Sequence, residues 1–317
     1  MTILFLLIAI LLALKIKLNS MKKIALTLVS CICVLSLVQC DTSTSTTGAG
    51  VDSTAAVASA DTLNATANWK IGVQMWTFRM FSFAEALDKV DSAGVKHIEA
   101  FWGQPLGAGT RDSFGLQMSA ASRAKIKGLL QAKGINIVAM GVISPATKDE
   151  WQKAFDLGKE FGLSYITAEP HKDQWNFVDS MAGAYGIKVA IHDHPKPNAY
   201  WSPDSVLAAI AGHPNIGSCA DVGHWARNGL NPVDCLKKLE GHIYGVHLKD
   251  IIKFDDTKAE DTVVGKGVID FPSIFQELKR QNFNGMFSIE HESNWYHSLP
   301  DVIATVQFYN DQVAKIK

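Results

Sequence analysis

The chain has 317 residues, of which 47% are hydrophobic and 19% charged, and its formal net charge at pH 7 is −1. A nearly neutral chain with no basic block after residue 23 is a poor partner for nucleic acid, whose phosphates attract clustered lysine and arginine. Three of the five cysteines fall within residues 1–40, so at most one disulfide remains for the rest of the chain and a disulfide scaffold is excluded.

Residues 1–40 are apolar and lysine-flanked, which is typical of a targeting segment. From Met21 a basic start leads into an apolar stretch shorter than the about 20 residues that span a bilayer, and the stretch ends at Cys40. This resembles a bacterial lipoprotein signal peptide, whose cysteine is acylated. We therefore expect an exported protein, anchored to a membrane by a lipid on Cys40, in the periplasm or cell envelope. A start at Met1 and a retained anchor over residues 3–38 are the alternatives.

Residues 41–67 are rich in serine, threonine, alanine and glycine and contain almost no large apolar side chains. Such a segment buries too little surface to offset its ordering entropy, so we expect a disordered, flexible tether. The folded domain is then residues 68–317, and about 250 residues match one closed α/β barrel.

Eight short apolar runs follow along this domain, separated by longer segments. They cover residues 70–76, 97–102, 135–142, 164–169, 187–194, 216–222, 243–250 and 285–292. Between the first two runs, Ser82 is a candidate N-cap and Gly94 a C-terminal stop for a helix over 81–94. Strands that alternate with helices predict right-handed crossovers and a parallel sheet, and eight such units predict a single (β/α)8 TIM barrel. An open doubly wound sheet would favour a glycine-rich loop after the first run, where QMWTFRMF (74–81) stands instead.

Ionisable side chains concentrate at the ends of the later runs, where a TIM barrel carries its chemistry. They are Glu169, His171, the triplet His192-Asp193-His194, Asp221, His224, His247, Lys249, Asp250, Glu290, His291 and Glu292. One histidine at a strand end is usually structural, but so many beside carboxylates predict a shared site. Imidazole and carboxylate suit zinc, manganese, cobalt or magnesium. Because alternate residues of a strand face opposite sides, Glu290 and Glu292 share a face that His291 does not.

Four motifs in this order resemble the sugar phosphate isomerase/epimerase family, a group of xylose isomerase-like TIM barrels. They are AEP (168–170), ADVGHW (220–225), VHLKD (246–250) and SIEHE (288–292), and the resemblance covers residues 70–317. It implies one divalent metal ion bound by four side chains, Glu169, Asp221, His247 and Glu290. It also implies that His224 contacts substrate and that His194 lies close to the metal or the sugar. The chain departs from the family at Asp193, where asparagine is frequent.

The implied chemistry is proton removal next to a carbonyl, with Glu169 and Glu290 as the acid–base pair on the two faces of the sugar. A divalent cation stabilises the resulting enediolate as a Lewis acid. We therefore expect a divalent-metal-dependent isomerase or epimerase of a sugar or keto-sugar. A leaving group beside the anion would instead be eliminated, which makes a lyase or hydrolase of 3-keto-glycosides an alternative. An endonuclease IV-like phosphodiesterase and a non-catalytic sugar-binding lipoprotein are the others.

Further side chains are expected to contact the carbohydrate. Four tryptophans fall at or just past strand runs: Trp76, Trp102, Trp225 and Trp295. Tryptophan offers a flat apolar face for a sugar ring and an N–H donor for a hydroxyl. Packing under loops explains each of them equally well. Lys249 is expected to bind a sugar oxygen, with an ordinary ion pair as the alternative. Glu99, in the second run, is expected to hydrogen-bond substrate or to brace the metal ligands.

Overall fold

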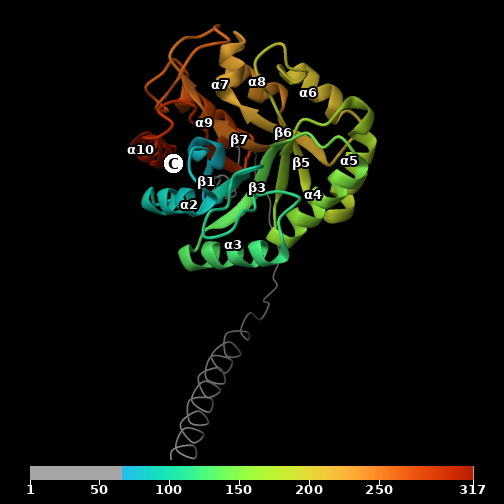
Figure 1. Cartoon of the computed structure of the whole chain (residues 1–317). Coiled ribbons are helices and arrows are strands. Elements are labelled where there is room, and N and C mark those ends of the chain that lie inside the picture. Colours follow the sequence, from blue (N-terminus) through green and yellow to red (C-terminus); the bar gives the residue numbers. More distant parts are fainter. Residues whose placement is uncertain (1–65, 317) are drawn as a thin grey trace, which may run out of the picture. The chain divides into compact units, whose positions relative to one another are not determined.

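Eight parallel strands close into a barrel in the computed structural model, which describes residues 66–316 (Figure 1). The strands are β1 (Lys70–Gln74), β2 (His97–Phe101), β3 (Asn136–Ile143), β4 (Tyr165–Ala168), β5 (Lys188–His192), β6 (Ile216–Asp221), β7 (Ile243–Leu248) and β10 (Met286–Ile289). Each expected run contributes one strand, and β1 closes the ring by pairing with both β2 and β10. The predicted (β/α)8 TIM barrel is therefore confirmed. The signal segment 1–40 with Cys40 lies outside the described residues, as does almost all of the tether 41–67.

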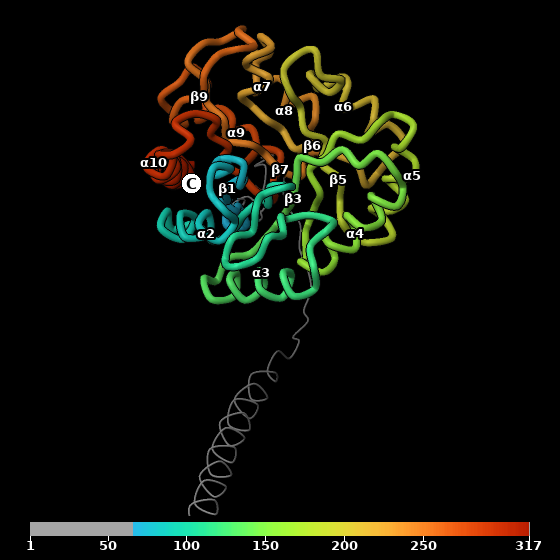
Figure 2. Tube along the Cα trace, viewed as in Figure 1, coloured from blue at the N-terminus to red at the C-terminus, as the bar shows by residue number. Residues whose placement is uncertain are grey.

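The helices surround the ring of strands (Figures 1 and 2). They are α2 (Phe83–Ser92), α3 (Ala120–Lys133), α4 (Lys148–Phe161), α5 (Trp175–Tyr185), α6 (Pro203–Ile210), α7 (Val222–Arg227), α8 (Pro232–Lys238), α9 (Phe271–Arg280) and α10 (Leu299–Lys315), with 3-10 turns η2 (Met75–Phe78) and η3 (Lys172–Gln174). Within residues 66–316, none of these helices combines the length and apolar character needed to cross a membrane.

Local sequence signals set the helix ends. Ser82 caps α2 in a capping box, because its hydroxyl accepts the Glu85 N–H while the Glu85 carboxylate accepts the Ser82 N–H. Gly134 ends α3 with φ of 61°, a left-handed conformation that glycine adopts without the steric cost of a Cβ. The expected N-cap at Ser82 is thus confirmed.

Alternate residues of each strand face opposite sides of the barrel wall, so the barrel has two apolar cores, and the inner one leads to the site. Residues such as Val189 and Ile191 of β5 pack between the strands and the helices. The alternate positions form a second, small cluster of Val138, Ala139, Tyr165, Ala190, Cys219 and Met286, which fills the barrel interior. His192 stands two residues after Ala190 and Asp221 two residues after Cys219, so both lie on the same inner face as this cluster. Polar side chains therefore occupy the inner positions at the carboxyl ends of the strands.

An antiparallel hairpin follows β7 and forms an arm over residues 250–270. Its short strands are β8 (Asp250–Ile251) and β9 (Asp261–Thr262). The buried Asp250 carboxylate accepts backbone N–H groups from four positions of the arm, Ile251, Gly265, Gly267 and Ile269. One aspartate thus holds together a segment that has almost no regular secondary structure.

Candidate metal centre

Four ligand atoms converge at the carboxyl ends of β5, β6, β7 and β10. They belong to His192, Asp221, His247 and Glu290, are buried, and all lie within 4.8 Å of one another. His247 Nδ1 lies 2.8 Å from Glu290 Oε2 and 3.1 Å from His192 Nε2. His192 Nε2 lies 3.6 Å from Asp221 Oδ2. We call these four residues the quartet.

A divalent ion fits the quartet. Ligands at metal–nitrogen and metal–oxygen bond lengths stand about 3.3 Å apart around a tetrahedral ion. Five of the six pairs in the quartet are separated by 2.8–3.9 Å, and all six lie within 4.8 Å. Asp221 Oδ2 is buried and accepts no hydrogen bond of good geometry, although the Lys249 ammonium lies 3.2 Å from it, whereas Oδ1 accepts the N–H groups of Gly223 and His224. A buried carboxylate oxygen that faces three other ligand atoms and makes no hydrogen bond of good geometry suits a metal, because a buried acceptor without one is costly. The nitrogen and oxygen donors alone do not select one metal among zinc, manganese, cobalt and magnesium.

Glu99 supports the quartet from below. Its Oε2 atom accepts hydrogen bonds from His247 Nε2 and from the Ser288 hydroxyl, each at 2.9 Å. Burial raises the pKa of Glu99, but His247 outweighs this effect and the pKa is lowered overall. Because Glu99 is fully buried, it is placed to brace His247 rather than to contact substrate.

Glu169 lies beside the quartet rather than within it. Strand β4 ends at Ala168, so Glu169 is already in the following loop, where its carboxylate hydrogen-bonds His194 Nδ1 and the Asn198 amide. It groups instead with His192 and His194. His192, which the family resemblance does not imply as a ligand, takes the fourth position. The signal for it is strand alternation, because His192 shares the inner face with Ala190.

Lys249 and His224 lie behind the quartet. The Lys249 ammonium is buried, 3.2 Å from Asp221 Oδ2, 3.3 Å from Glu290 Oε2 and 3.1 Å from His224 Nε2. Burial lowers the pKa of Lys249, but Asp221 and Glu290 outweigh it and the pKa rises well above its usual value. Burial lowers the pKa of His224 well below its usual value, which favours the neutral ring. The alternative reading of Lys249, an ion pair with Asp250, is replaced by ion pairs with the quartet carboxylates Asp221 and Glu290.

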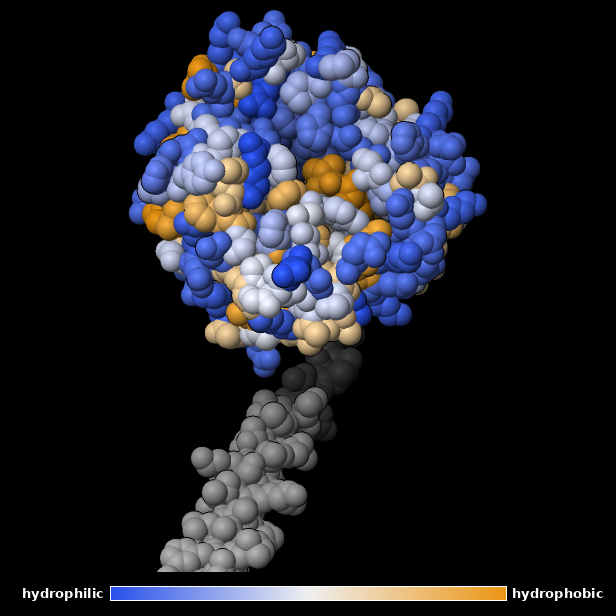
Figure 3. Space-filling view, viewed as in Figure 1, coloured by the Kyte–Doolittle hydropathy of each residue, from blue (hydrophilic) through white to orange (hydrophobic). Residues whose placement is uncertain are grey.

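A cavity of about 210 Å³ opens above the quartet, and we call it the mouth cavity. Its lining includes Gln74, Trp76, Phe101, His194, Glu290 and Glu292. The Trp76 indole packs edge-on against Phe101 at 4.7 Å and donates its N–H to Glu292 at 2.9 Å. In the space-filling view, hydrophilic residues cover most of the rim of this face and hydrophobic ones gather near its centre (Figure 3).

Three of the four expected tryptophans do not line the mouth cavity. Trp295 packs edge-on against Trp76, with ring centroids 6.5 Å apart. Trp225 is completely buried, because it lies on α7 and packs into the core, so it cannot stack on a sugar. Trp102 lines a neighbouring cavity instead. Of the aromatic residues expected to meet substrate, Trp76 is the one at the mouth.

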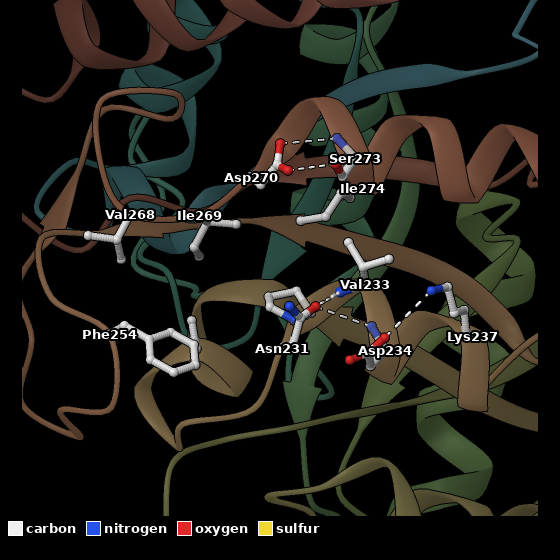
Figure 4. Close-up of a pocket in the computed structure, with 12 residues that line it drawn as sticks. Asn231, Val233, Asp234, Lys237, Phe254, Val268, Ile269, Asp270, Ser273 and Ile274 are labelled. Atoms are coloured by element: carbon white, nitrogen blue, oxygen red, sulfur yellow. Dashed lines mark hydrogen bonds and ion pairs between the residues drawn. The ribbon is translucent and has the colours of Figure 1, made fainter.

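A separate cavity of about 370 Å³ lies between α8, α9 and the arm (Figure 4). Its polar groups already have structural roles: Asn231 caps α8, Asp270 caps α9, and Lys237 pairs with Asp234 at 3.5 Å. No residue of the quartet lines this cavity. The reactive groups therefore lie in the barrel mouth rather than here.

The fold and the quartet together define the class: a TIM barrel with a histidine–carboxylate centre at its strand ends. The chain belongs to the xylose isomerase-like TIM barrel family, whose model matches residues 87–311. Among solved structures, it is similar to an uncharacterized protein from Parabacteroides distasonis ATCC 8503, with 35% identity, a TM-score of 0.63, and coverage of 77% of this chain and 99% of that chain.

Two further relatives have more specific descriptions. The chain is 28% identical over 146 residues to inosose dehydratase of Clostridium botulinum (strain Alaska E43 / Type E3), covering 39% of this chain and 49% of that protein. It thus spans about half the length of the curated relatives it matches. A structure of the IOLI protein with a zinc atom superposes with a TM-score of 0.65 at 18% identity, covering 78% of this chain and 99% of that chain. At that identity the likeness shows the fold alone.

Proposed function

We propose that this protein is a divalent-metal-dependent enzyme that removes a proton next to the carbonyl group of a keto-sugar or cyclic polyol ketone. The observation that carries the proposal is the quartet, whose four buried ligand atoms all lie within 4.8 Å of one another. A divalent cation held there would act as a Lewis acid and stabilise the charge that develops on the substrate oxygen.

Glu169 is the proposed base and Glu290 the proposed second acid–base group. Burial raises the pKa of Glu169, but its hydrogen bond with His194 outweighs this and lowers the pKa overall, so the carboxylate is ionised at neutral pH and can accept a proton. The two carboxylates flank His192, since Glu290 Oε2 lies 3.8 Å from His192 Nε2 and Glu169 groups with the same ring. Trp76 and His194 would then orient the substrate in the mouth cavity.

Elimination is the outcome that we favour over reprotonation, because the family relatives that match in sequence include inosose dehydratases. After the proton leaves the carbon next to the carbonyl, its electron pair forms a double bond to the following carbon. The bond between that carbon and its oxygen breaks, and the oxygen takes a proton. Within residues 66–316, no lysine or arginine lines the mouth cavity, while Glu290 and Glu292 do. This charge pattern disfavours a phosphodiester substrate.

The proposal is tested by incubating the metal-loaded protein with a panel of keto-sugars and inososes in deuterated water. We expect deuterium at the carbon next to the carbonyl, or loss of the leaving group, seen by NMR and mass spectrometry. Glu169→Gln and Glu290→Gln should each lower the rate by about 10²-fold or more, since a positioned acid–base group contributes that much. Glu260→Gln, an exposed glutamate of the arm, is the matched control. Full activity in either site variant would contradict the proposal.

A further inference from the structure

A second cavity, of about 440 Å³, adjoins the mouth cavity at the ends of β2 and β3, and we call it the Trp102 cavity. Val142 lines both cavities. Phe101 of the mouth cavity is followed directly in the chain by Trp102 of the second one. The two cavities therefore share Val142 as a wall residue.

The walls of the Trp102 cavity combine a flat aromatic ring with free polar groups. The Trp102 ring packs over Gly115, where an added Cβ would lie 3.3 Å from the indole and where φ is +146°. Gln117 and Ser144 also line the cavity with exposed side chains, and within residues 66–316 neither they nor the Trp102 indole N–H has a protein hydrogen-bond partner. An apolar ring face beside unpaired donors and acceptors suits a sugar ring, whose faces are apolar and whose rim carries hydroxyls.

Charge in this cavity points to a neutral ligand. Glu150 is its ionisable lining residue, and the Glu150 carboxylate already accepts the N–H groups of Ala146 and Thr147 at the start of α4. An anionic ligand would meet this carboxylate without a compensating cation among the lining residues. A polar but uncharged ring fits these surroundings better.

We propose that the Trp102 cavity is a second carbohydrate subsite, so that the substrate is a glycoside with one ring in each cavity. The inference rests on the proposed function, which places the reacting ring in the mouth cavity beside His194 and Glu290. In the elimination, the ring in the Trp102 cavity is the leaving group: its bond to the reacting ring breaks as the proton leaves the neighbouring carbon, and its oxygen takes a proton. The step needs no further reactant.

The test is calorimetric binding to the full-length protein of glucose and of four disaccharides, maltose, cellobiose, lactose and trehalose. We expect at least one disaccharide to bind about tenfold more tightly than glucose, because a second ring on an indole adds stacking and hydrogen bonds. Trp102→Ala should remove this gain and leave glucose binding unchanged. Gln117→Ala, a change at an exposed side chain, should remove part of it. Tyr296→Ala, 62% exposed and lining neither cavity, is the aromatic control.

Three results would overturn the subsite: no disaccharide binding better than glucose, a gain that survives both Trp102→Ala and Gln117→Ala, or a p-nitrophenyl glucoside that outbinds every disaccharide through Trp102. The last would assign the cavity to an aromatic group. Deuterium exchange into a keto-monosaccharide without disaccharide preference overturns the subsite and leaves the proposed function standing. Disaccharide binding that depends on Trp102, without deuterium exchange into any keto-sugar, supports the subsite and overturns the proposed function.

Discussion

The His247 ring has two nitrogen atoms with different partners. Nε2 donates to Glu99, which turns Nδ1 toward His192 and Glu290 in the quartet, where Nδ1 would bind a metal once it has no proton. A carboxylate that fixes a histidine in this way raises its strength as a metal ligand. The metal affinity of the quartet should therefore depend on Glu99, a residue that touches neither metal nor substrate.

We expect Glu99→Gln to weaken metal binding by about 10- to 100-fold, the usual effect of losing such a partner. Titration of Zn²⁺ or Mn²⁺ into chelator-treated protein measures the effect directly. Ser288→Ala is the matched control, because it removes the other donor to Glu99 Oε2 and keeps the bond to His247. An unchanged affinity in Glu99→Gln would show that the tautomer of His247 does not depend on this carboxylate.

At the level of single residues, three of the four expected metal ligands lie together in the quartet, and Glu169 lies in an adjoining group that shares His192. Asp221, His247 and Glu290 meet as expected because each stands on the inner face at a strand end. Glu169 falls outside the quartet because β4 ends one residue earlier, and its carboxylate turns to Asn198, a contact across the loop after β5 that no local pattern reveals. Trp225 is buried because α7 begins directly after β6, so that the residue lies on a helix instead of a loop.

At the level of elements, the arm depends on Asp250. Its carboxylate accepts four backbone N–H groups, and the arm then carries Asp261, which pairs with Arg227 and accepts the Glu292 N–H. Arg227 and Glu292 are therefore held in place by the arm, which depends on the buried side chain of Asp250.

We expect Asp250→Ala to lower the free energy of unfolding by about 3 kcal/mol, because several buried N–H groups lose a charged acceptor at once. Urea unfolding followed by circular dichroism measures this change. Asp256→Ala, in the same arm but more exposed, should cost less than about 1 kcal/mol. Equal losses in the two variants would mean that the Asp250 hydrogen bonds do not determine the stability of the arm.

The barrel strands and the arm differ in how far sequence predicts them. The barrel strands are four- to eight-residue runs of apolar residues whose pattern is local, so their positions follow from composition and period. The strands β8 and β9 have two residues each, and they form because Asp250 reaches residues up to 19 positions away. Hydrogen bonds over such a separation produce no periodic pattern in the sequence. The Trp102 cavity likewise depends on the loop after β2 packing against the end of β3.

For the whole molecule, barrel closure is what assembles the quartet. His192 and Glu290 are distant in sequence, yet β5, β6, β7 and β10 are successive neighbours in the ring, so their carboxyl ends meet. A metal that binds all four ligands bridges these strands and binds the folded state alone. Metal affinity should therefore appear as stability of the entire barrel.

We expect Zn²⁺ or Mn²⁺ at about 100 times its dissociation constant to add about 2.7 kcal/mol of stability, or a rise in Tm of about 5–10 °C, reversed by a chelator. The effect should depend on pH in a defined direction. Burial lowers the pKa of His192, but Asp221 and Glu290 outweigh this and raise it to about 9. Without metal, the protonated ring is stabilising below its unfolded pKa, and that stability is lost as pH rises toward 9.

Metal binding requires the neutral His192 ring, so the proton must leave, and affinity should fall by up to about tenfold for each pH unit below 9. The metal-free Tm should therefore decrease between pH 6.5 and 9, while the metal-induced rise in Tm increases over the same range. Scanning calorimetry with and without metal at pH 6.5, 7.5 and 8.5 measures both slopes. His192→Gln should make both slopes smaller and leave the contribution of His247, whose pKa is also raised, whereas His171→Gln, at an exposed histidine, should change neither. A metal-induced rise in Tm that does not change with pH would show that His192 is not a ligand, and the quartet would then lose the member that the barrel geometry adds to it.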